Sequence, residues 1–123
     1  MPETKKRILF IDDERPFRML SRINLEAAGY QVDSAADASE AIACVEEQRF
    51  DLIILDLLMP QPDGFKVFQK LKDLKITTQT PVLLLTVLGW EPQVQQLIAD
   101  GAHHLKKDDA PEQVLPMVKE LIG

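Results

Sequence analysis

Residues 52–60, Leu-Ile-Ile-Leu-Asp-Leu-Leu-Met-Pro, carry the clearest structural signal in the chain. The first four form a short apolar run, which is typical of a buried β-strand. Asp56 follows the run directly, so it would lie at the carboxyl end of that strand. Open α/β folds place their ligand sites at this edge of the sheet. We therefore expect Asp56 to take part in binding or chemistry.

A second apolar run, Ile8 to Ile11, ends in the same way, with Asp12 and Asp13. Carboxylates at the ends of two buried strands would gather negative charge at one point of the sheet edge. Because such groups repel each other, they need a cation beside them to stay ionised together. Carboxylate oxygens suit Mg²⁺, which keeps several waters and bridges to phosphate. The two runs together predict a magnesium site formed by Asp12, Asp13 and Asp56.

The remaining sequence alternates short apolar runs with segments of helical periodicity, in a pattern of five βα units. Strands are expected at 7–11, 30–35, 52–55, 82–85 and 104–106, and helices at 16–28, from 37 onward, 64–74, 92–100 and from about 111. Apolar strands separated by helices predict an α/β fold with a parallel sheet covered on both faces. The pattern alone does not set the strand order.

Two of the helices carry more specific expectations. In the helix at 16–28, the spacing of Leu20, Ile23 and Ala27 predicts a buried apolar face. The last helix is expected to start near Pro111, which puts Pro116 in its interior. A proline in that position removes a hydrogen bond and should kink the helix.

Length and composition narrow the functional class. A chain of 123 residues suits a single domain, here residues 1–123. Its formal net charge of −6 argues against direct contact with nucleic acid, which would need a basic face. The single cysteine, Cys44, rules out an internal disulfide and fits a reducing compartment. We expect neither a signal peptide nor a membrane span, and a cytoplasmic location.

Further polar residues follow the other strands. Thr86 follows the run at 82–85, and Lys106 and Lys107 stand at the end of the expected strand at 104–106. In a parallel sheet these residues would share one edge with Asp56. A carboxylate can attack a phosphoryl group and form an acyl phosphate. A hydroxyl and an ammonium nearby would hold the phosphoryl oxygens as charge develops.

With these residues in place, the chain resembles a response regulator receiver domain of two-component signalling, of the kind found in chemotaxis regulators. The resemblance runs from Arg7 to the C-terminus and rests on Asp12-Asp13, Asp56-Leu57-Leu58-Met59-Pro60 with Asp63-Gly64, Thr86, Gly101-Ala102 and a lysine after the fifth strand. It implies a flavodoxin-like, three-layer α/β/α fold whose parallel strands have the order 2-1-3-4-5.

The resemblance also implies a role for each matching residue. Asp56 would be the phosphoacceptor. Asp13 would bind Mg²⁺ directly, and Asp12 would act mostly through a bound water. Leu58 would offer its backbone carbonyl to the metal. Thr86 would donate a hydrogen bond to the phosphoryl group and move toward it on activation.

The position of the active lysine is less clearly marked. In this family a switch residue, usually aromatic, precedes the lysine by three positions, so His104 would be the switch residue if Lys107 is the active lysine. Lys106 stays as the alternative. Asp108 follows Lys107 where the family usually has proline, so we expect a reshaped loop at this point.

The lifetime of the acyl phosphate can also be addressed. Within the family, the residues two positions beyond the phosphoacceptor and the threonine influence how water reaches the phosphoryl group. Here they are Leu58 and Leu88, both apolar. Apolar walls exclude water and do not orient it for attack. We predict at most slow self-dephosphorylation and no other enzymatic activity.

Three functional classes are open at this point. The favoured one is a switch that takes a phosphoryl group from a sensor histidine kinase or a phosphotransfer protein and presents a changed surface to a downstream effector. The second is a receiver-like binding module that works without phosphorylation, suggested by Asp108 and Pro116. The third, a Mg²⁺-dependent phosphatase, would need a general acid and a substrate pocket, for which the sequence offers no convincing pair.

Overall fold

The computed structural model describes residues 5–57, 63–86, 92–109 and 112–123, without the side chains of residues 63, 86 and 93. The elements alternate along the chain as β1 (Arg7–Ile11), α1 (Arg15–Ala27), β2 (Gln31–Ala35), α2 (Ala38–Glu47), β3 (Leu52–Asp56), α3 (Asp63–Asp73), the 3₁₀ turn η1 (Ile76–Thr78), β4 (Val82–Thr86), α4 (Pro92–Ala99), β5 (His103–Lys106), the 3₁₀ turn η2 (Lys107–Asp109) and α5 (Val114–Ile122).

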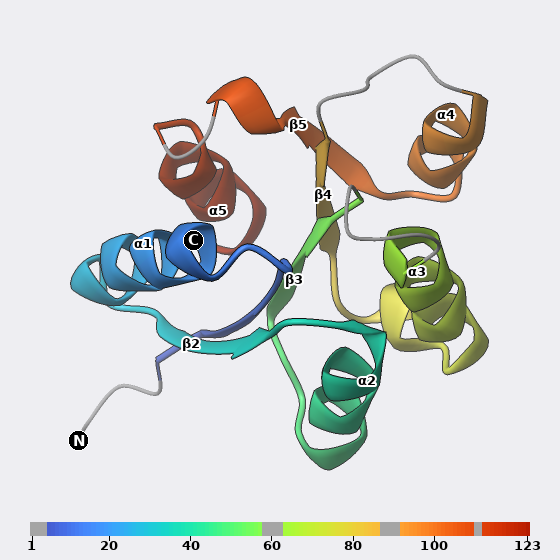
Figure 1. Cartoon of the computed structure of the whole chain (residues 1–123), viewed down its shortest axis with the longest axis horizontal. Helices are drawn as coiled ribbons and strands as arrows, with labels where there is room; N and C mark the ends of the chain where they lie inside the picture. Colours follow the sequence, from blue (N-terminus) through green and yellow to red (C-terminus); the bar gives the residue numbers. More distant parts are fainter. Residues whose placement is uncertain (1–4, 58–62, 87–91, 110–111) are drawn as a thin grey trace.

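The strands form one five-stranded sheet in the order β2-β1-β3-β4-β5, and every neighbouring pair is parallel. Figure 1 shows α1 and α5 on one face of the sheet and α2, α3 and α4 on the other. The predicted flavodoxin-like, three-layer fold and its strand order are therefore confirmed. The strand boundaries agree with those predicted to within one residue.

The core consists of two layers, one on each face of the sheet. Alternate residues of β1 serve the two layers, so that Leu9 packs toward α2, α3 and α4 while Ile8 and Phe10 pack toward α1 and α5. Because both faces are covered, β1 and β3 are apolar without interruption. Complete burial of one such side chain stabilises the fold by about 1.5–3 kcal/mol. The ends of β1 and β3 therefore adjoin the part of the sheet that is buried on both faces.

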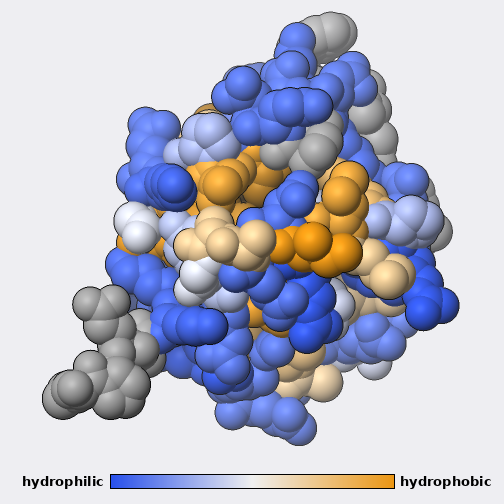
Figure 2. Space-filling view, turned by 90° about the vertical axis from the view of Figure 1, so that its left-hand side faces the viewer, coloured by the Kyte–Doolittle hydropathy of each residue, from blue (hydrophilic) through white to orange (hydrophobic). Residues whose placement is uncertain are grey.

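The helix α1 differs from its prediction in the face that it buries. Ser21 and Leu25, four residues apart, face the core, whereas Leu20 is 47% exposed and Ile23 is 60% exposed. The spacing of Leu20, Ile23 and Ala27 is helical, but it marks a face that points to solvent. Met19 is exposed as well, and Figure 2 shows apolar surface on this side of the molecule. The predicted buried face was wrong, and α1 carries an uncovered apolar surface instead.

The helix α5 begins at Val114, so the predicted start near Pro111 was wrong. Pro116 is the third residue of the helix and lies in its first turn. Backbone N–H groups of a first turn have no partner within a helix, so a proline there costs no helical hydrogen bond. Pro116 therefore removes no hydrogen bond within α5, and the kink predicted from such a loss is not expected.

The helix α2 begins where the sequence predicted. The side chain of Asp37 accepts a hydrogen bond from the backbone N–H of Glu40 at 2.9 Å. The carboxylate of Glu40 in turn accepts one from the backbone N–H of Ala36 at 2.7 Å. This reciprocal pair satisfies two backbone donors at the start of the helix, as in a capping box.

Within the described residues, no helix has both the length and the apolar character needed to cross a membrane.

Candidate functional site

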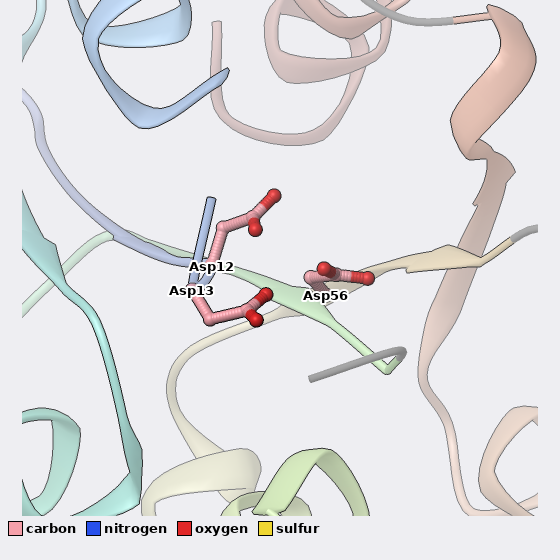
Figure 3. Close-up of side chains that lie close together, drawn as sticks. All are labelled: Asp12, Asp13 and Asp56. Carbon is pink, nitrogen blue, oxygen red and sulfur yellow. The ribbon is translucent and has the colours of Figure 1, made fainter. Parts of the chain in front are cut away.

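The ends of β1 and β3 bring three carboxylates together. Ile11 pairs with Leu55 in the sheet, so Asp12 and Asp56, the residues that follow this pair, are neighbours. Asp12 is completely buried and Asp56 is only 1% exposed, whereas Asp13 is exposed. Figure 3 shows Asp12 and Asp13 projecting from the end of β1 on the side where Asp56 projects from β3. One carboxylate oxygen of each lies within 4.8 Å of the others.

This cluster has the features of a cation site. Oδ1 of Asp12 accepts a hydrogen bond from the backbone N–H of Glu14 at 2.9 Å. Oδ2 of Asp12 is buried and accepts no hydrogen bond from any residue that the structure describes. A buried carboxylate oxygen without a hydrogen bond is costly, and a metal ion at this point would add to the ion pair that this oxygen makes with Lys107 at 3.3 Å. The donor set, three carboxylates open to solvent on the side of Asp13, fits Mg²⁺.

Lys107 brings a positive charge to two of the carboxylates. Its Nζ donates a hydrogen bond to Oδ2 of Asp56 at 3.0 Å and lies 3.3 Å from Oδ2 of Asp12. Lys106 pairs with Thr86 at the last position of β5 and is exposed. Of the two lysines that the sequence offered, the structure places Lys107 at the carboxylates, on the turn η2 directly after β5.

Burial and charge shift the ionisation of the site. Burial raises the pKa of Asp12 to about 7, and the negative charge of Asp56 acts in the same direction. The hydrogen bond from the backbone of Glu14 and the charge of Lys107 oppose this rise. For Lys107, burial lowers the pKa, but its hydrogen bonds to Glu14 and Asp56 outweigh burial and hold the pKa above its usual range. Lys107 is therefore a permanent ammonium at neutral pH.

Position 64, at the start of α3, has room only for glycine. A Cβ atom at this position would lie 2.8 Å from the Cα and 2.9 Å from the carbonyl oxygen of Leu57. No side chain fits at these distances, so only glycine lets the start of α3 approach the end of β3 this closely. Leu57 is in turn held to β4 by a hydrogen bond from its N–H to the carbonyl oxygen of Leu85 at 3.0 Å. The backbone beside Asp56 is thus fixed from two sides.

Three residues with predicted roles at the site fall partly or wholly outside the described residues. The backbone of Thr86 ends β4 beside Lys106, but its side chain is outside the described part. Leu58, predicted to offer its carbonyl to the metal, and Leu88, predicted to exclude water, also lie outside it. The roles of these residues stay predictions.

His104 lies on β5 opposite Leu84 and is half-buried. Its Nε2 atom is buried and has no hydrogen-bond partner in the part of the chain that the structure describes. His103, the preceding residue, is exposed, as expected for neighbours on a strand. His104 thus occupies the position predicted for the switch residue, and its role as a switch is a prediction.

Two contacts of Lys107 were missed by the sequence analysis. Its Nζ donates a hydrogen bond to Oε1 of Glu14 at 2.7 Å, and it lies 5.0 Å from the centre of the Phe17 ring. Glu14 and Lys107 are 93 residues apart in sequence, so no local pattern could show this pair. The only available signal was that Glu14 extends the acidic run of Asp12 and Asp13.

Comparison with known proteins assigns this site to a family. The model of the family described as "Response regulator receiver domain" matches residues 8–119. The transcriptional regulatory protein ResD of Bacillus subtilis is 40% identical over 121 residues, which cover 98% of this chain and 48% of ResD. The chain spans about half the length of the curated relatives it matches.

Solved structures agree with the sequence comparison. The chemotaxis response regulator CheY4 of Vibrio cholerae has a TM-score of 0.86 and 34% identity, with 96% of this chain and 99% of that chain covered. The response regulator TrrA of Thermotoga maritima, solved in complex with Mg²⁺ and BeF, has a TM-score of 0.79 and 30% identity, with 94% and 98% covered.

Proposed function

This chain belongs to the response regulator receiver domain family, and on that basis we propose that Asp56 accepts a phosphoryl group from a phosphohistidine donor. A receiver domain of two-component regulators is a signalling domain that binds Mg²⁺ at an acidic site. The observation that carries the proposal is the buried carboxylate of Asp56, which accepts a hydrogen bond from Lys107 and lies beside the acidic pair Asp12 and Asp13. We propose that residues 1–123 act as one such domain.

The transfer is a substitution at phosphorus. A carboxylate oxygen of Asp56 attacks the phosphorus atom, a P–O bond forms, and the P–N bond to the donor's imidazole breaks. Asp12 and Asp13 would hold Mg²⁺, which when bound neutralises the charge on the phosphoryl oxygens. Lys107 already donates to Asp56 and would donate to the phosphoryl oxygens after transfer.

The remaining roles complete this proposal. The carbonyl of Leu58 would bind the metal, the hydroxyl of Thr86 would bind the phosphoryl group, and His104 would change its position with the state of Asp56. The apolar residues Leu58 and Leu88 support slow loss of the phosphoryl group. A faster loss in a Leu58→Asn, Leu88→Glu variant is the expected result of a phosphate-release assay.

The uncovered surface of α1 supports a protein donor. A donor that brings a phosphohistidine to Asp56 must cover the edge of the sheet where α1 begins at Arg15. Met19, Leu20 and Ile23 expose apolar side chains on α1, from about one to two turns after Arg15. We propose that a sensor histidine kinase or a phosphotransfer protein covers this surface during transfer.

The downstream partner belongs to the same proposal. We propose an effector protein or domain that reads the state of Asp56. ResD is named as a transcriptional regulatory protein, and the lack of direct contact with nucleic acid stays a prediction for this chain. A module that works without phosphorylation is not favoured, because Asp12, Asp13, Asp56 and Lys107 are all present and close together.

A direct experiment tests the proposal. The protein is incubated with Mg²⁺ and a small acyl-phosphate donor, and its intact mass is measured. We expect a phosphoryl adduct on the parent protein and none on Asp56→Asn. An unmodified parent protein under saturating donor would contradict the proposal, and an equal adduct on Asp56→Asn would move the acceptor elsewhere.

A further inference from the structure

Glu14 has no role in the chemistry described so far, yet it makes the shortest contact of Lys107. Its carboxylate lies 2.7 Å from Nζ, compared with 3.0 Å for Asp56 and 3.3 Å for Asp12. Glu14 precedes α1 as its N-cap residue, but its side chain makes no capping hydrogen bond to the described first turn. The side chain is instead directed to a lysine at the far end of the chain.

The first turn of α1 also brings an aromatic ring, that of Phe17, to the ammonium of Lys107. Phe17 lies three residues after Glu14, so both side chains are on the same side of the helix. The Lys107 ammonium lies over the Phe17 ring, and that ring packs edge-on against Phe10 of β1 at 5.7 Å between centroids. Glu14 and Phe17 therefore both contact the ammonium of Lys107, in addition to its contacts with the buried carboxylates of Asp12 and Asp56.

We propose that Glu14 is a positioning residue that holds Lys107 in the unphosphorylated protein and gives it up when Asp56 carries a phosphoryl group. This inference rests on the proposed function. A lysine ammonium has three N–H donors, and the hydrogen bonds to Glu14 and Asp56 use two of them. A phosphoryl group adds several anionic oxygens, which compete with the carboxylate of Glu14 for the N–H donors of Lys107. The Glu14–Lys107 pair therefore favours the unphosphorylated state.

The expected effect of the pair is modest. Glu14 is 63% exposed and Lys107 is 14% exposed, so water screens the pair from one side only. Ion pairs of this kind change an equilibrium by about twofold to fivefold. Replacement of Glu14 by the uncharged, isosteric glutamine should raise the affinity for a phosphoryl group by that factor.

Beryllofluoride, a phosphoryl mimic, allows the affinity to be measured at saturating Mg²⁺. We expect Glu14→Gln to bind beryllofluoride about twofold to fivefold more tightly than the parent. Asp108→Asn removes the same charge next to Lys107 without removing a described contact of its ammonium, and serves as the control. An unchanged affinity in Glu14→Gln, or an equal gain in Asp108→Asn, would overturn the proposal, because the effect would then be absent or due to net charge.

A spectroscopic measurement separates positioning from a general effect on the fold. The ¹H–¹⁵N signal of the Lys107 ammonium, identified by its loss in Lys107→Arg, is recorded with and without beryllofluoride. We expect Glu14→Gln to shift this signal in the free protein and to leave it unchanged in the bound protein. If the free parent and free Glu14→Gln give the same Lys107 signal, Glu14 does not position Lys107. If the parent binds no beryllofluoride, the proposed function fails, while the signal of the free protein still reports on the Glu14 pair.

Discussion

The centre of the sheet and its β5 edge build the two halves of the site in different ways. Asp12 and Asp56 follow two central strands that are buried on both faces, and their own side chains are buried. Lys107 lies on a short turn after the edge strand β5 and stays partly exposed. The core therefore fixes Asp12 and Asp56, the acidic half, whereas Lys107, the basic half, depends on contacts with side chains, including Glu14 and Phe17.

The largest effect on transfer, apart from loss of Asp56 itself, should come from the basic half. Lys107→Ala removes the ammonium that would hold the phosphoryl oxygens, so phosphorylation by a small donor should slow by about 10²- to 10³-fold. Lys106→Ala is the matched control, because Lys106 is the exposed neighbour on β5. The initial rate of adduct formation, followed by mass, checks this. Equal rates for the two variants would show that the basic half does not act through Lys107.

In the acidic half, removal of one charge should separate metal binding from stability. Asp12→Asn takes away a buried charge that would hold the metal mostly through a bound water, so Mg²⁺ affinity should fall by about tenfold to a hundredfold. Without Mg²⁺ at pH 8, the same variant should unfold at the same temperature as the parent or higher, because a buried charge is no longer forced to ionise. Calorimetric titration and a melting curve test the two halves of this prediction. A marked fall in melting temperature would mean that Asp12 stabilises the fold.

The raised pKa of Asp12 predicts how both properties change with pH. The folded state holds a proton on Asp12 up to about pH 7, while the unfolded chain releases it near pH 4. Between these values the folded state binds more protons, so the free energy of unfolding without Mg²⁺ should fall as pH rises. Mg²⁺ competes with that proton, so its affinity should drop by up to about tenfold per unit below pH 7. Asp12→Asn should remove this dependence, and a parent affinity that is flat from pH 5.5 to 8 would contradict it.

The smallest effect on stability should come from the uncovered surface of α1. Ile23→Ser changes an exposed side chain and should alter the free energy of unfolding by less than about 0.5 kcal/mol. Leu25→Ala, on the buried side of the same helix, should cost about 2–5 kcal/mol. Transfer from a phosphohistidine protein should slow in Ile23→Ser, while transfer from a small donor stays unchanged. If both donors slow equally, the surface is not a docking site.

The sequence predicted the strands that are covered on both faces of the sheet better than it predicted the helix α1, which is covered on one side only. Runs such as Ile8–Ile11 and Leu52–Leu55 are apolar because both faces of the sheet are covered, so their position and the acids after them could be predicted. The periodicity of α1 was misleading, because Leu20 and Ile23 are apolar but exposed. A helical spacing shows that residues share a face, and it does not show which face meets the sheet.

The basic half was harder to predict for a different reason. The choice between Lys106 and Lys107 depends on where β5 ends, and a shift of one residue reverses which side chain faces the site. The start of α5 was also misplaced, which made Pro116 look disruptive. The contact between Glu14 and Lys107 joins residues that are distant in sequence, so it follows from the strand order and cannot be read from any local motif.

The central claim is that Asp56, and not a neighbouring acid, carries the phosphoryl group. Reduction of the phosphorylated protein with borohydride converts an acyl phosphate to an alcohol, and peptide mass mapping then locates the modified residue. The account predicts a single modified position, Asp56, that depends on Mg²⁺. Modification at Asp12 or Asp13, or none at all in protein that carries the adduct, would contradict it.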